Sequence, residues 1–304
     1  MKNNHGILDL LFSFMCLNPT TYKTIMRFNM EVKMNELKDI KCFLLDMDGT
    51  FYLGNTIIDG ALDFLDILKS QQKKFIFLTN NSSKNKSTYK QKLSALGCYV
   101  DEEQIYTSGE ATIWYMKKNC IGNKIYLMGT EPLMAEFEKA GFILVKDKND
   151  KPDYVVLGFD TTLTYEKIWT ACDYIRDGVP FIATHPDFNC PIENGQYMPD
   201  TGSMIRMFES STGISPVVIG KPYGYIVEAI IEKYGLKKEE VAIVGDRLYT
   251  DIKTGVNAGI TSVLVLSGET SEAMYKESDI TADYVFSSIK YIGEELMQFC
   301  ESFI

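Results

Sequence analysis

The sequence predicts an α/β protein: a doubly wound, Rossmann-like parallel sheet with a second α/β domain inserted into it. Short apolar runs alternate with longer segments whose apolar residues recur at helical spacing, as expected for strands covered on both faces by helices. Four of these runs end in polar residues suited to binding a phosphate group or a metal ion. Because ligands bind at the carboxyl ends of strands in such sheets, the second pattern predicts one site shared by distant segments.

The elements of the main sheet come from two separate parts of the chain. Apolar runs that predict strands are Cys42–Leu45, Phe75–Leu78, Val241–Val244 and Ser262–Leu266. Segments with helical periodicity are Ala61–Leu68, Lys84–Leu96 and Asp251–Ala258. This alternation predicts strand–helix–strand units, which form parallel sheets.

The middle of the chain repeats the same pattern. Strands are expected at Ile125–Met128, Tyr154–Leu157 and Phe181–Ala183, with a helix at Tyr165–Arg176. We therefore expect an inserted domain at 122–215, between two core segments at 34–121 and 216–304.

Residues 1–33 precede the regular pattern. Their apolar run, Ile7–Leu17, is interrupted by Asp9 and Ser13 and is too short to span a bilayer. It also lacks the basic start and the cleavage site of a signal peptide. Two interpretations stay open: a helical appendage, or an upstream extension created by a misplaced start codon.

The composition narrows the classes of function. With a net charge of −10, the chain is poorly suited to bind nucleic acid, whose phosphates require basic residues. A small phosphorylated substrate needs only a local positive site. The seven Cys residues form no C-x-x-C pair, and with two His residues a zinc site is not expected. Reduced thiols in a cytoplasmic protein are the expectation, with no membrane partner.

The strongest motif is Asp46-Met47-Asp48-Gly49-Thr50, directly after the first strand. Two carboxylates two residues apart, followed by a glycine, fit a turn in which both face one site. Gly49 also allows backbone N–H groups to approach an anion closely. The alternative is an ordinary acidic turn, since Asp and Gly are common there.

Three further motifs follow strands but are weak individually. Thr79-Asn80-Asn81 offers phosphate donors, although a helix N-cap explains it equally well. Gly220-Lys221-Pro222 offers a point charge, although most lysines are simply solvated. Asp246 and Asp251 suit one hard cation, although they also fit an acidic helix start. The specificity lies in the ordered set of four motifs.

This ordered set, from about Cys42 to Leu266, resembles the haloacid dehalogenase-like hydrolase superfamily. Three segments are similar to its NagD-type, 4-nitrophenylphosphatase-like branch, which carries a large α/β cap. They are Thr79-Asn80-Asn81-Ser82, Thr184-His185-Pro186-Asp187 and Pro199-Asp200-Thr201-Gly202-Ser203. Many members have Asn in place of His185 and Gly in place of Asp200, and these departures concern the choice of substrate.

The resemblance implies a magnesium-dependent phosphatase. Asp46 would attack phosphorus to form an aspartyl-phosphate, and Asp48 would act as general acid and then general base. Mg²⁺ would be held by Asp46, by the backbone carbonyl of Asp48 and by Asp246, with Asp251 orienting a bound water. The phosphate would be bound by Lys221, Thr79 and backbone N–H groups near Gly49 and Asn80.

The resemblance also implies that the cap selects the substrate, a small phosphorylated metabolite. The candidate cap residues are His185, Asp187 and Thr201. A homodimer formed through the cap is expected. Two alternatives remain open: a phosphomutase, and a catalytically silent phosphometabolite-binding protein on the same fold. Asp48 favours rapid turnover of a phosphoenzyme, and the filled polar positions argue against a silent protein.

Overall fold

The computed structural model describes residues 37–146, 150–192 and 195–301, so the expectations for residues 1–33 lie outside the described part. The chain separates into two compact units, Met1–Ile40 and Lys41–Ile304. In the first unit, residues 37–39 are helical. All elements named below belong to the second unit.

The core of the second unit is a six-stranded parallel sheet with the order β15-β14-β13-β1-β4-β5. Its strands are β1 (Cys42–Leu45), β4 (Lys74–Thr79), β5 (Ile105–Thr107), β13 (Val241–Gly245), β14 (Thr261–Val265) and β15 (Tyr284–Phe286). The central strand β1 pairs with β4 on one side and with β13 on the other. The order of connections reverses across β1, which creates the crevice where ligands bind in doubly wound sheets.

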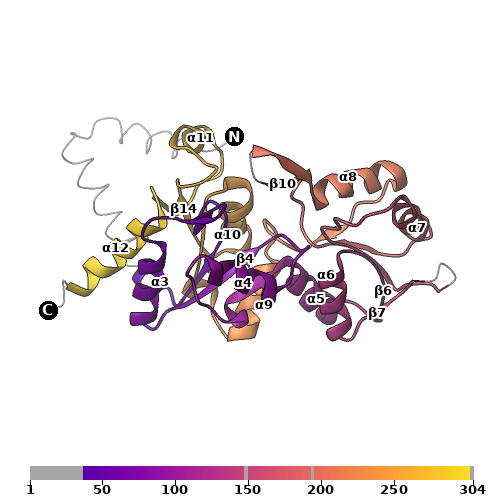
Figure 1. Ribbon diagram of the computed structural model, residues 1–304, viewed down its shortest axis with the longest axis horizontal. Coiled ribbons are helices and arrows are strands. Elements are labelled where there is room, and N and C mark those ends of the chain that lie inside the picture. The colour runs from indigo at the N-terminus through magenta and orange to yellow at the C-terminus, as the bar shows by residue number, and fades with distance from the viewer. Residues whose placement is uncertain (1–36, 147–149, 193–194, 302–304) are drawn as a thin grey trace, which may run out of the picture. The chain divides into compact units, whose positions relative to one another are not determined.

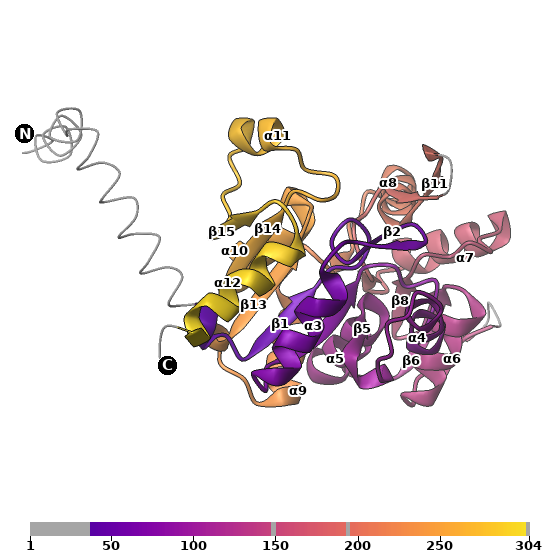
Figure 2. The ribbon, with the colours of Figure 1, turned by 60° about the vertical axis from the view of Figure 1, so that its left-hand side comes forward.

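Helices cover both faces of this sheet, as the continuous apolar runs predict. Helices α3 (Ala61–Ser70) and α12 (Ile289–Glu301) lie side by side on one face (Figure 2). There the ring of Phe43 packs edge-on against Phe64 of α3, with centroids 5.8 Å apart. The opposite face, which includes Leu44, packs against α9 (Tyr225–Tyr234). Because successive strand residues point to opposite faces, β1 must be apolar throughout.

Three further helices belong to the core of this unit. They are α4 (Lys86–Ala95), α5 (Ser108–Asn119) and α10 (Lys253–Ala258). A short antiparallel hairpin, β2 (Tyr52–Leu53) and β3 (Thr56–Ile57), follows the loop after β1. A six-residue helix, α11 (Glu272–Glu277), precedes β15.

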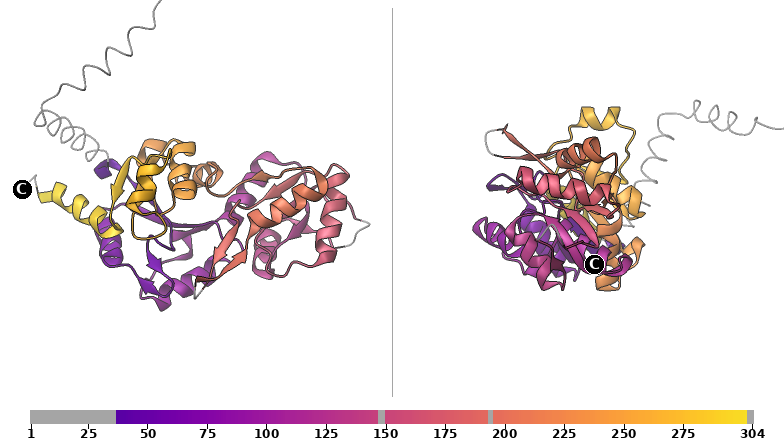
Figure 3. Two further views of the ribbon diagram at one scale, coloured as in Figure 1. Left: turned by 90° about the horizontal axis from the view of Figure 1, so that it is seen from above. Right: turned by 90° about the vertical axis from the view of Figure 1, so that its right-hand side faces the viewer.

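The middle of the chain forms a second, five-stranded parallel sheet with the order β12-β9-β8-β6-β7. In Figure 3 this segment runs from magenta to orange. Its strands are β6 (Lys124–Met128), β7 (Ile143–Leu144), β8 (Tyr154–Leu157), β9 (Phe181–Ala183) and β12 (Val217–Val218). Since β12 pairs with β9, this sheet extends past residue 215, where we expected the insert to end.

Helices also cover the second sheet on both faces. Helices α7 (Tyr165–Arg176) and α8 (Thr201–Thr212) pack together on one face, and α6 (Glu131–Lys139) lies on the other (Figure 1). A hairpin of β10 (Asn189–Pro191) and β11 (Tyr197–Pro199) precedes α8. The inserted α/β domain is therefore a complete layered unit, and we call it the cap. No helix among the described residues is long and apolar enough to cross a membrane.

Candidate active site

The carboxyl ends of β1, β4 and β13 meet beside a cavity of about 230 Å³. Core residues that line it include Asp46, Asp48, Thr79, Asn80 and Lys221. Cap residues from the loop after β9 and from the β10–β11 hairpin also line it. All four motifs predicted from the sequence thus contribute to one cavity, the fourth through Arg247 and Thr250, which lie between Asp246 and Asp251.

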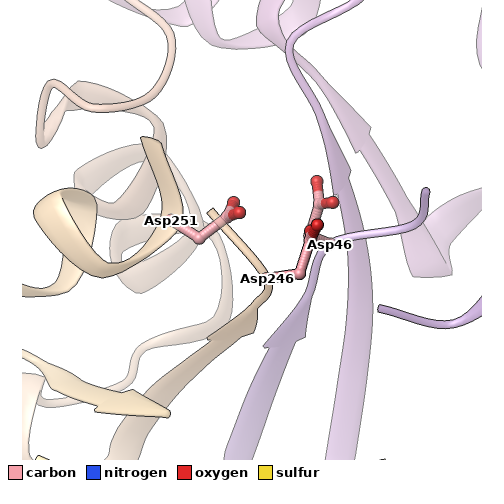
Figure 4. Close-up of side chains that lie close together, drawn as sticks. All are labelled: Asp46, Asp246 and Asp251. Atoms are coloured by element: carbon pink, nitrogen blue, oxygen red, sulfur yellow. The ribbon is translucent and has the colours of Figure 1, made fainter. Parts of the chain in front are cut away.

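Three buried carboxylates gather at this end of the sheet (Figure 4). Asp46 follows β1, Asp246 follows β13, and Asp251 lies in a π-helical turn at Leu248–Ile252, just before α10. One oxygen from each lies within 4.8 Å of the others. The backbone N–H of Asp46 donates to the Val244 carbonyl at 2.9 Å, which extends the pairing of β1 and β13 to the nucleophile candidate.

The clustering disfavours three simultaneous negative charges. Burial raises the pKa of Asp246 to about 7, and the charges of Asp46 and Asp251 add to this effect. Burial also raises the pKa of Asp251 to about 6, where the Asp46 charge adds to the shift and Lys221 opposes it. A divalent cation would relieve this repulsion, and carboxylate oxygens are the ligands that Mg²⁺ prefers. The donor set therefore fits magnesium.

Asp246 is held tightly between two loops. Its Oδ1 accepts a hydrogen bond from Thr50 Oγ1 at 3.3 Å, and its Oδ2 accepts one from the Glu269 N–H at 2.7 Å. Gly49 lies against it with a φ of +90°, and a Cβ there would be 2.3 Å from Asp246 Oδ2. The close approach thus requires glycine. The N–H of Gly49 itself donates to the Tyr52 carbonyl, so in this conformation it is not directed at a phosphate.

Lys221 bridges two of the carboxylates. Its Nζ lies 2.5 Å from Asp46 Oδ1 and 2.6 Å from Asp251 Oδ1. Burial alone would lower the pKa of this lysine, but Asp251 and Asp46 together raise the pKa above its ordinary range. The ammonium therefore stays charged. The other oxygen of Asp251 accepts from the Arg247 N–H at 3.2 Å, so protein donors occupy both of its oxygens.

The side chain of Asn80 positions Lys221. Asn80 Oδ1 accepts the backbone N–H of Lys221 at 2.8 Å, and Asn80 Nδ2 donates to the Lys221 carbonyl at 2.9 Å. The same Nδ2 lies 3.1 Å from an oxygen of Asp187 in the cap. From the sequence we expected backbone N–H groups near Asn80 to bind phosphate. The structure adds a clamp made by its side chain.

Asp48 and Thr79 also line the cavity. Burial raises the pKa of Asp48 above its ordinary value; Lys92 opposes the shift and Asp46 adds to it. A carboxyl group that retains its proton more readily is suited to act as an acid. Thr79 Oγ1 accepts the Asn81 N–H at 3.1 Å, and the hydroxyl also forms a side-chain hydrogen bond with Tyr89.

The three candidate cap residues separate into two groups. Asp187 lines the cavity, whereas His185 and Thr201 are fully buried and lie outside its lining. Burial lowers the pKa of His185, and its Nε2 lies 3.0 Å from Thr201 Oγ1. The same nitrogen lies 3.5 Å from Asp200, which does line the cavity. From the sequence we expected His185 and Thr201 to approach the substrate. In the structure they lie behind Asp200, which lines the cavity, and do not line it themselves.

Comparisons with known proteins agree with this architecture. A family model described as haloacid dehalogenase-like hydrolase matches residues 43–143, and one described as HAD-hydrolase-like matches residues 218–292. The acid sugar phosphatase of Staphylococcus saprophyticus is 34% identical over 260 residues, which are 86% of this chain and 99% of that protein. This chain belongs to the haloacid dehalogenase-like hydrolases.

Two solved structures of this hydrolase family have the same fold. The 4-nitrophenylphosphatase of Thermotoga maritima is 46% identical with a TM-score of 0.81, covering 85% of this chain and 98% of that one. A glycerol phosphate phosphatase of Mycobacterium tuberculosis, solved with magnesium, is 27% identical with a TM-score of 0.79. That match covers 86% of this chain and 79% of the other. Within the family, the chain is a phosphatase of the NagD and 4-nitrophenylphosphatase branch.

Sequence reasoning missed several residues that line the cavity of this hydrolase. They are Tyr52, Lys84, Tyr89, Lys92, Cys190, Met198 and Arg247. Tyr52 belongs to the β2–β3 hairpin, and Lys92 to the interior of α4. Neither follows a sheet strand, so the rule of polar strand ends does not find them. Arg247 directly follows Asp246 in the fourth motif, so its cationic side chain was a signal in the sequence for a residue that lines the cavity.

Proposed function

We propose that this phosphatase hydrolyses small phosphomonoesters in a magnesium-dependent reaction with Asp46 as the nucleophile. The observation that carries the proposal is the position of the Asp46 carboxylate. It lies at the end of β1, 2.5 Å from the Lys221 ammonium and within the cluster of three carboxylates. The names of the relatives, an acid sugar phosphatase, a 4-nitrophenylphosphatase and a glycerol phosphate phosphatase, support this substrate class.

Asp46 and Asp246 would hold Mg²⁺ directly, together with the backbone carbonyl of Asp48. Bound there, the ion would neutralise charge on the transferring phosphoryl group. The raised pKa values of Asp246 and Asp251 support a cation site, because burial and then the neighbouring carboxylate charges disfavour their ionised forms, and a bound cation would reverse this. One oxygen of Asp251 is already paired with the Lys221 ammonium, whereas Asp246 accepts only a hydroxyl and a backbone N–H. Asp251 is therefore better suited to orient its neighbours than to bind the ion.

In the first step, an Asp46 oxygen attacks phosphorus and the bond to the leaving oxygen breaks. This forms an aspartyl-phosphate. The Lys221 ammonium would exchange its ion pair with the Asp46 carboxylate for one with a phosphate oxygen. Its second contact, with Asp251, would hold the ammonium in place during that exchange. Thr79 would donate its hydroxyl proton to another phosphate oxygen.

Asp48 would supply the proton that the leaving oxygen requires. Its raised pKa supports this role, because the carboxyl must be protonated when the ester bond breaks. In the second step the Asp48 carboxylate takes a proton from water. The water oxygen bonds to phosphorus, the aspartyl oxygen leaves, and Asp46 is regenerated with release of inorganic phosphate.

The cap would close the leaving-group side of the cavity. The β10–β11 hairpin contributes apolar residues such as Met198, and Asp187 joins the cap to Asn80 of the core. Excluding bulk water there strengthens the electrostatic interactions with the phosphate. We also propose a homodimer through the cap, which multi-angle light scattering tests: a monomeric mass at working concentration contradicts it.

The direct test of the function is hydrolysis of 4-nitrophenyl phosphate with and without Mg²⁺. We expect turnover that depends on the metal and is abolished by Asp46→Asn. Asp63→Asn, an exposed substitution on α3, serves as the matched control and retains activity. If Asp46→Asn retains turnover, Asp46 is not the nucleophile. If the wild type neither turns over nor binds beryllofluoride with Mg²⁺, the proposed function is wrong.

A further inference from the structure

Two lysines of the cavity wall lack a salt bridge within the described residues. Lys84, in the loop before α4, and Lys92, on α4, both line the cavity. In the described part of the chain, neither forms an ion pair with a carboxylate. The other cations of the wall are balanced: Lys221 by Asp46 and Asp251, and Arg247 by Glu269.

The acidic groups of the cap wall, in contrast, already have donors. Asp187 accepts hydrogen bonds from Asn80 Nδ2 on both of its oxygens, at 3.2 and 3.1 Å. Asp200 accepts the Thr201 N–H at 2.6 Å and the Thr201 hydroxyl at 3.1 Å. These carboxylates are therefore engaged by neutral donors, whereas Lys84 and Lys92 are cations of the wall that no described carboxylate holds in an ion pair.

Lys92 is fixed at a defined place in the wall. Its ammonium lies 4.0 Å from the centroid of the Tyr52 ring, a cation–π contact with a buried residue of the β2–β3 hairpin. Lys92 also interacts electrostatically with Asp48 and with Lys84. Since Asp48 is the group proposed to protonate the leaving oxygen, Lys92 lies on the leaving-group side of the phosphate. Lys84 is close enough to repel it, so an anion between the two would be attracted by both.

We propose that Lys84 and Lys92 select substrates whose leaving group carries a second anionic group, a carboxylate or a phosphate, close to the ester oxygen. The inference rests on the proposed function and specifies its substrate class. The ammonium groups would bind that anion while Lys221 binds the transferring phosphate. Both lysines are specificity-determining residues in this proposal, because they contact the part of the substrate that leaves.

Four phosphomonoesters with the same two-carbon leaving group test the proposal. The four esters are ethyl phosphate, 2-phosphoglycolate, ethanediol bisphosphate and O-phosphoethanolamine. They differ only at the end remote from the ester oxygen, which is a methyl group, a carboxylate, a second phosphate or an ammonium group, respectively. We expect kcat/KM for at least one of the two anionic esters to exceed that of ethyl phosphate by about tenfold, with the ammonium ester poorest. The two anionic esters distinguish carboxylate from phosphate. A preference for the ammonium ester overturns the proposal. It would indicate that Asp187 and Asp200, rather than the lysines, select the leaving group.

Variants assign the preference to the lysines. Lys92→Met is expected to reduce the ratio of kcat/KM for the preferred anionic ester to that for ethyl phosphate by about tenfold, mainly through KM. Lys92→Arg retains most of the ratio, and Lys84→Met reduces it less because Lys84 is exposed. Lys90→Met is the control: Lys90 lies on the same helix, pairs with Asp101 and does not line the cavity.

Two results separate this proposal from its competitors. If Lys92→Met lowers kcat equally for all four esters and shifts the pH profile, Lys92 acts on Asp48 and the proposal is wrong. Calorimetric binding of the same esters to Asp46→Asn needs no turnover, so it tests the selection even if the proposed function fails. Equal affinity of that variant for ethyl phosphate and both anionic esters overturns the inference by itself.

Discussion

The side-chain amide of Asn80 makes two hydrogen bonds to the backbone of Lys221, one donated and one accepted. The two residues are 141 positions apart and follow different segments of the core. A primary amide is the simplest side chain that can satisfy a backbone N–H and a carbonyl of the same residue. The motif after β4 therefore fixes the catalytic lysine candidate as well as lining the cavity.

Replacing Asn80 tests this clamp. Asn80→Ala leaves the buried N–H and C=O of Lys221 without their partners, which is expected to destabilise the fold by about 1 to 3 kcal/mol. We also expect kcat for 4-nitrophenyl phosphate to fall by at least about tenfold, because the ammonium is no longer held at phosphate distance. Thermal unfolding and steady-state kinetics measure the two effects. Asn80→Asp keeps the acceptor but places a carboxylate oxygen against the Lys221 carbonyl and Asp187, so its loss of stability is expected to be at least as large. An unchanged kcat in Asn80→Ala would contradict the role.

Removing the charge of Lys221 is expected to have a larger effect. Lys221→Met leaves Asp46 and Asp251 buried without their shared cation, so the metal-free protein loses about 3 kcal/mol of stability. Urea denaturation measures this loss. The matched control is Lys290→Met, because Lys290 forms a surface ion pair with Asp59 whose loss changes stability by less than about 1 kcal/mol. Equal stability of the two variants would show that the buried pair is not needed.

The effect of Mg²⁺ on thermal stability is expected to grow with pH. The pKa of Asp246 is raised to about 7 and that of Asp251 to about 6, both well above the ordinary range of an aspartate. In the metal-free protein these groups therefore reduce stability as pH rises from about 4 through 7. Mg²⁺ must displace the same protons, so its gain in melting temperature is larger at pH 8 than at pH 5. Asp246→Asn should remove most of this difference; a gain that is independent of pH would contradict a carboxylate site.

Replacing Gly49 tests whether close packing against Asp246, a candidate metal ligand, is needed for metal binding. Its φ is +90° and an added Cβ would be 2.3 Å from Asp246, so Gly49→Ala is expected to weaken Mg²⁺ binding at least about tenfold. Gly54→Ala, in the turn of the β2–β3 hairpin that follows, is the matched control. Its φ is also positive, at +58°, but nothing lies within 4 Å of an added Cβ. Metal titrations followed by calorimetry separate the shared backbone strain from the clash. Equal affinities in both variants would exclude the clash.

A second pH effect is expected between the core and the cap. Burial raises the pKa of Glu136 on α6 to about 7, and Glu110 on α5 adds to the shift. Each has a buried Oε2 without a hydrogen-bond partner. A buried carboxyl with a raised pKa destabilises the folded protein as pH rises through that pKa, because the group must then ionise. Glu136→Gln is therefore expected to stabilise the protein at pH 8 by about 1 kcal/mol. At pH 5 the gain should vanish. Denaturation at the two pH values checks this, and a gain of the same size at both would exclude titration of Glu136 as the cause.

The core of the fold was predictable because its strands are buried on both faces. Full burial forces continuous apolar runs, as in Cys42–Leu45, and the switch at β1 brings polar strand ends together. The two-residue strand β12 was placed outside the insert. So short an element carries no periodic signal, and only its pairing with β9 assigns it to the second sheet.

The site was predictable where its residues directly follow strands. It was much less predictable where the conformation of a loop decides which side chains face the cavity. Asp46, Asp246, Asp251 and Lys221 come together as their positions after apolar runs implied. The sequence of the loop after β9 did not reveal that Asp187 faces the cavity while His185 turns inward to Thr201. That choice depends on tertiary packing, as does the contact of Lys92 with Tyr52.

The interruption of the core by the cap also governs when activity can arise during synthesis. Asp46 leaves the ribosome early, but Asp246, which binds Thr50 across 196 residues, is among the later parts translated. A nascent chain that stops after Lys221 contains the candidate nucleophile Asp46 and the lysine, yet it lacks β13 and the candidate metal ligand Asp246. A translation product that ends before β13 therefore lacks a complete candidate site, and the cap has emerged in full before that site can assemble.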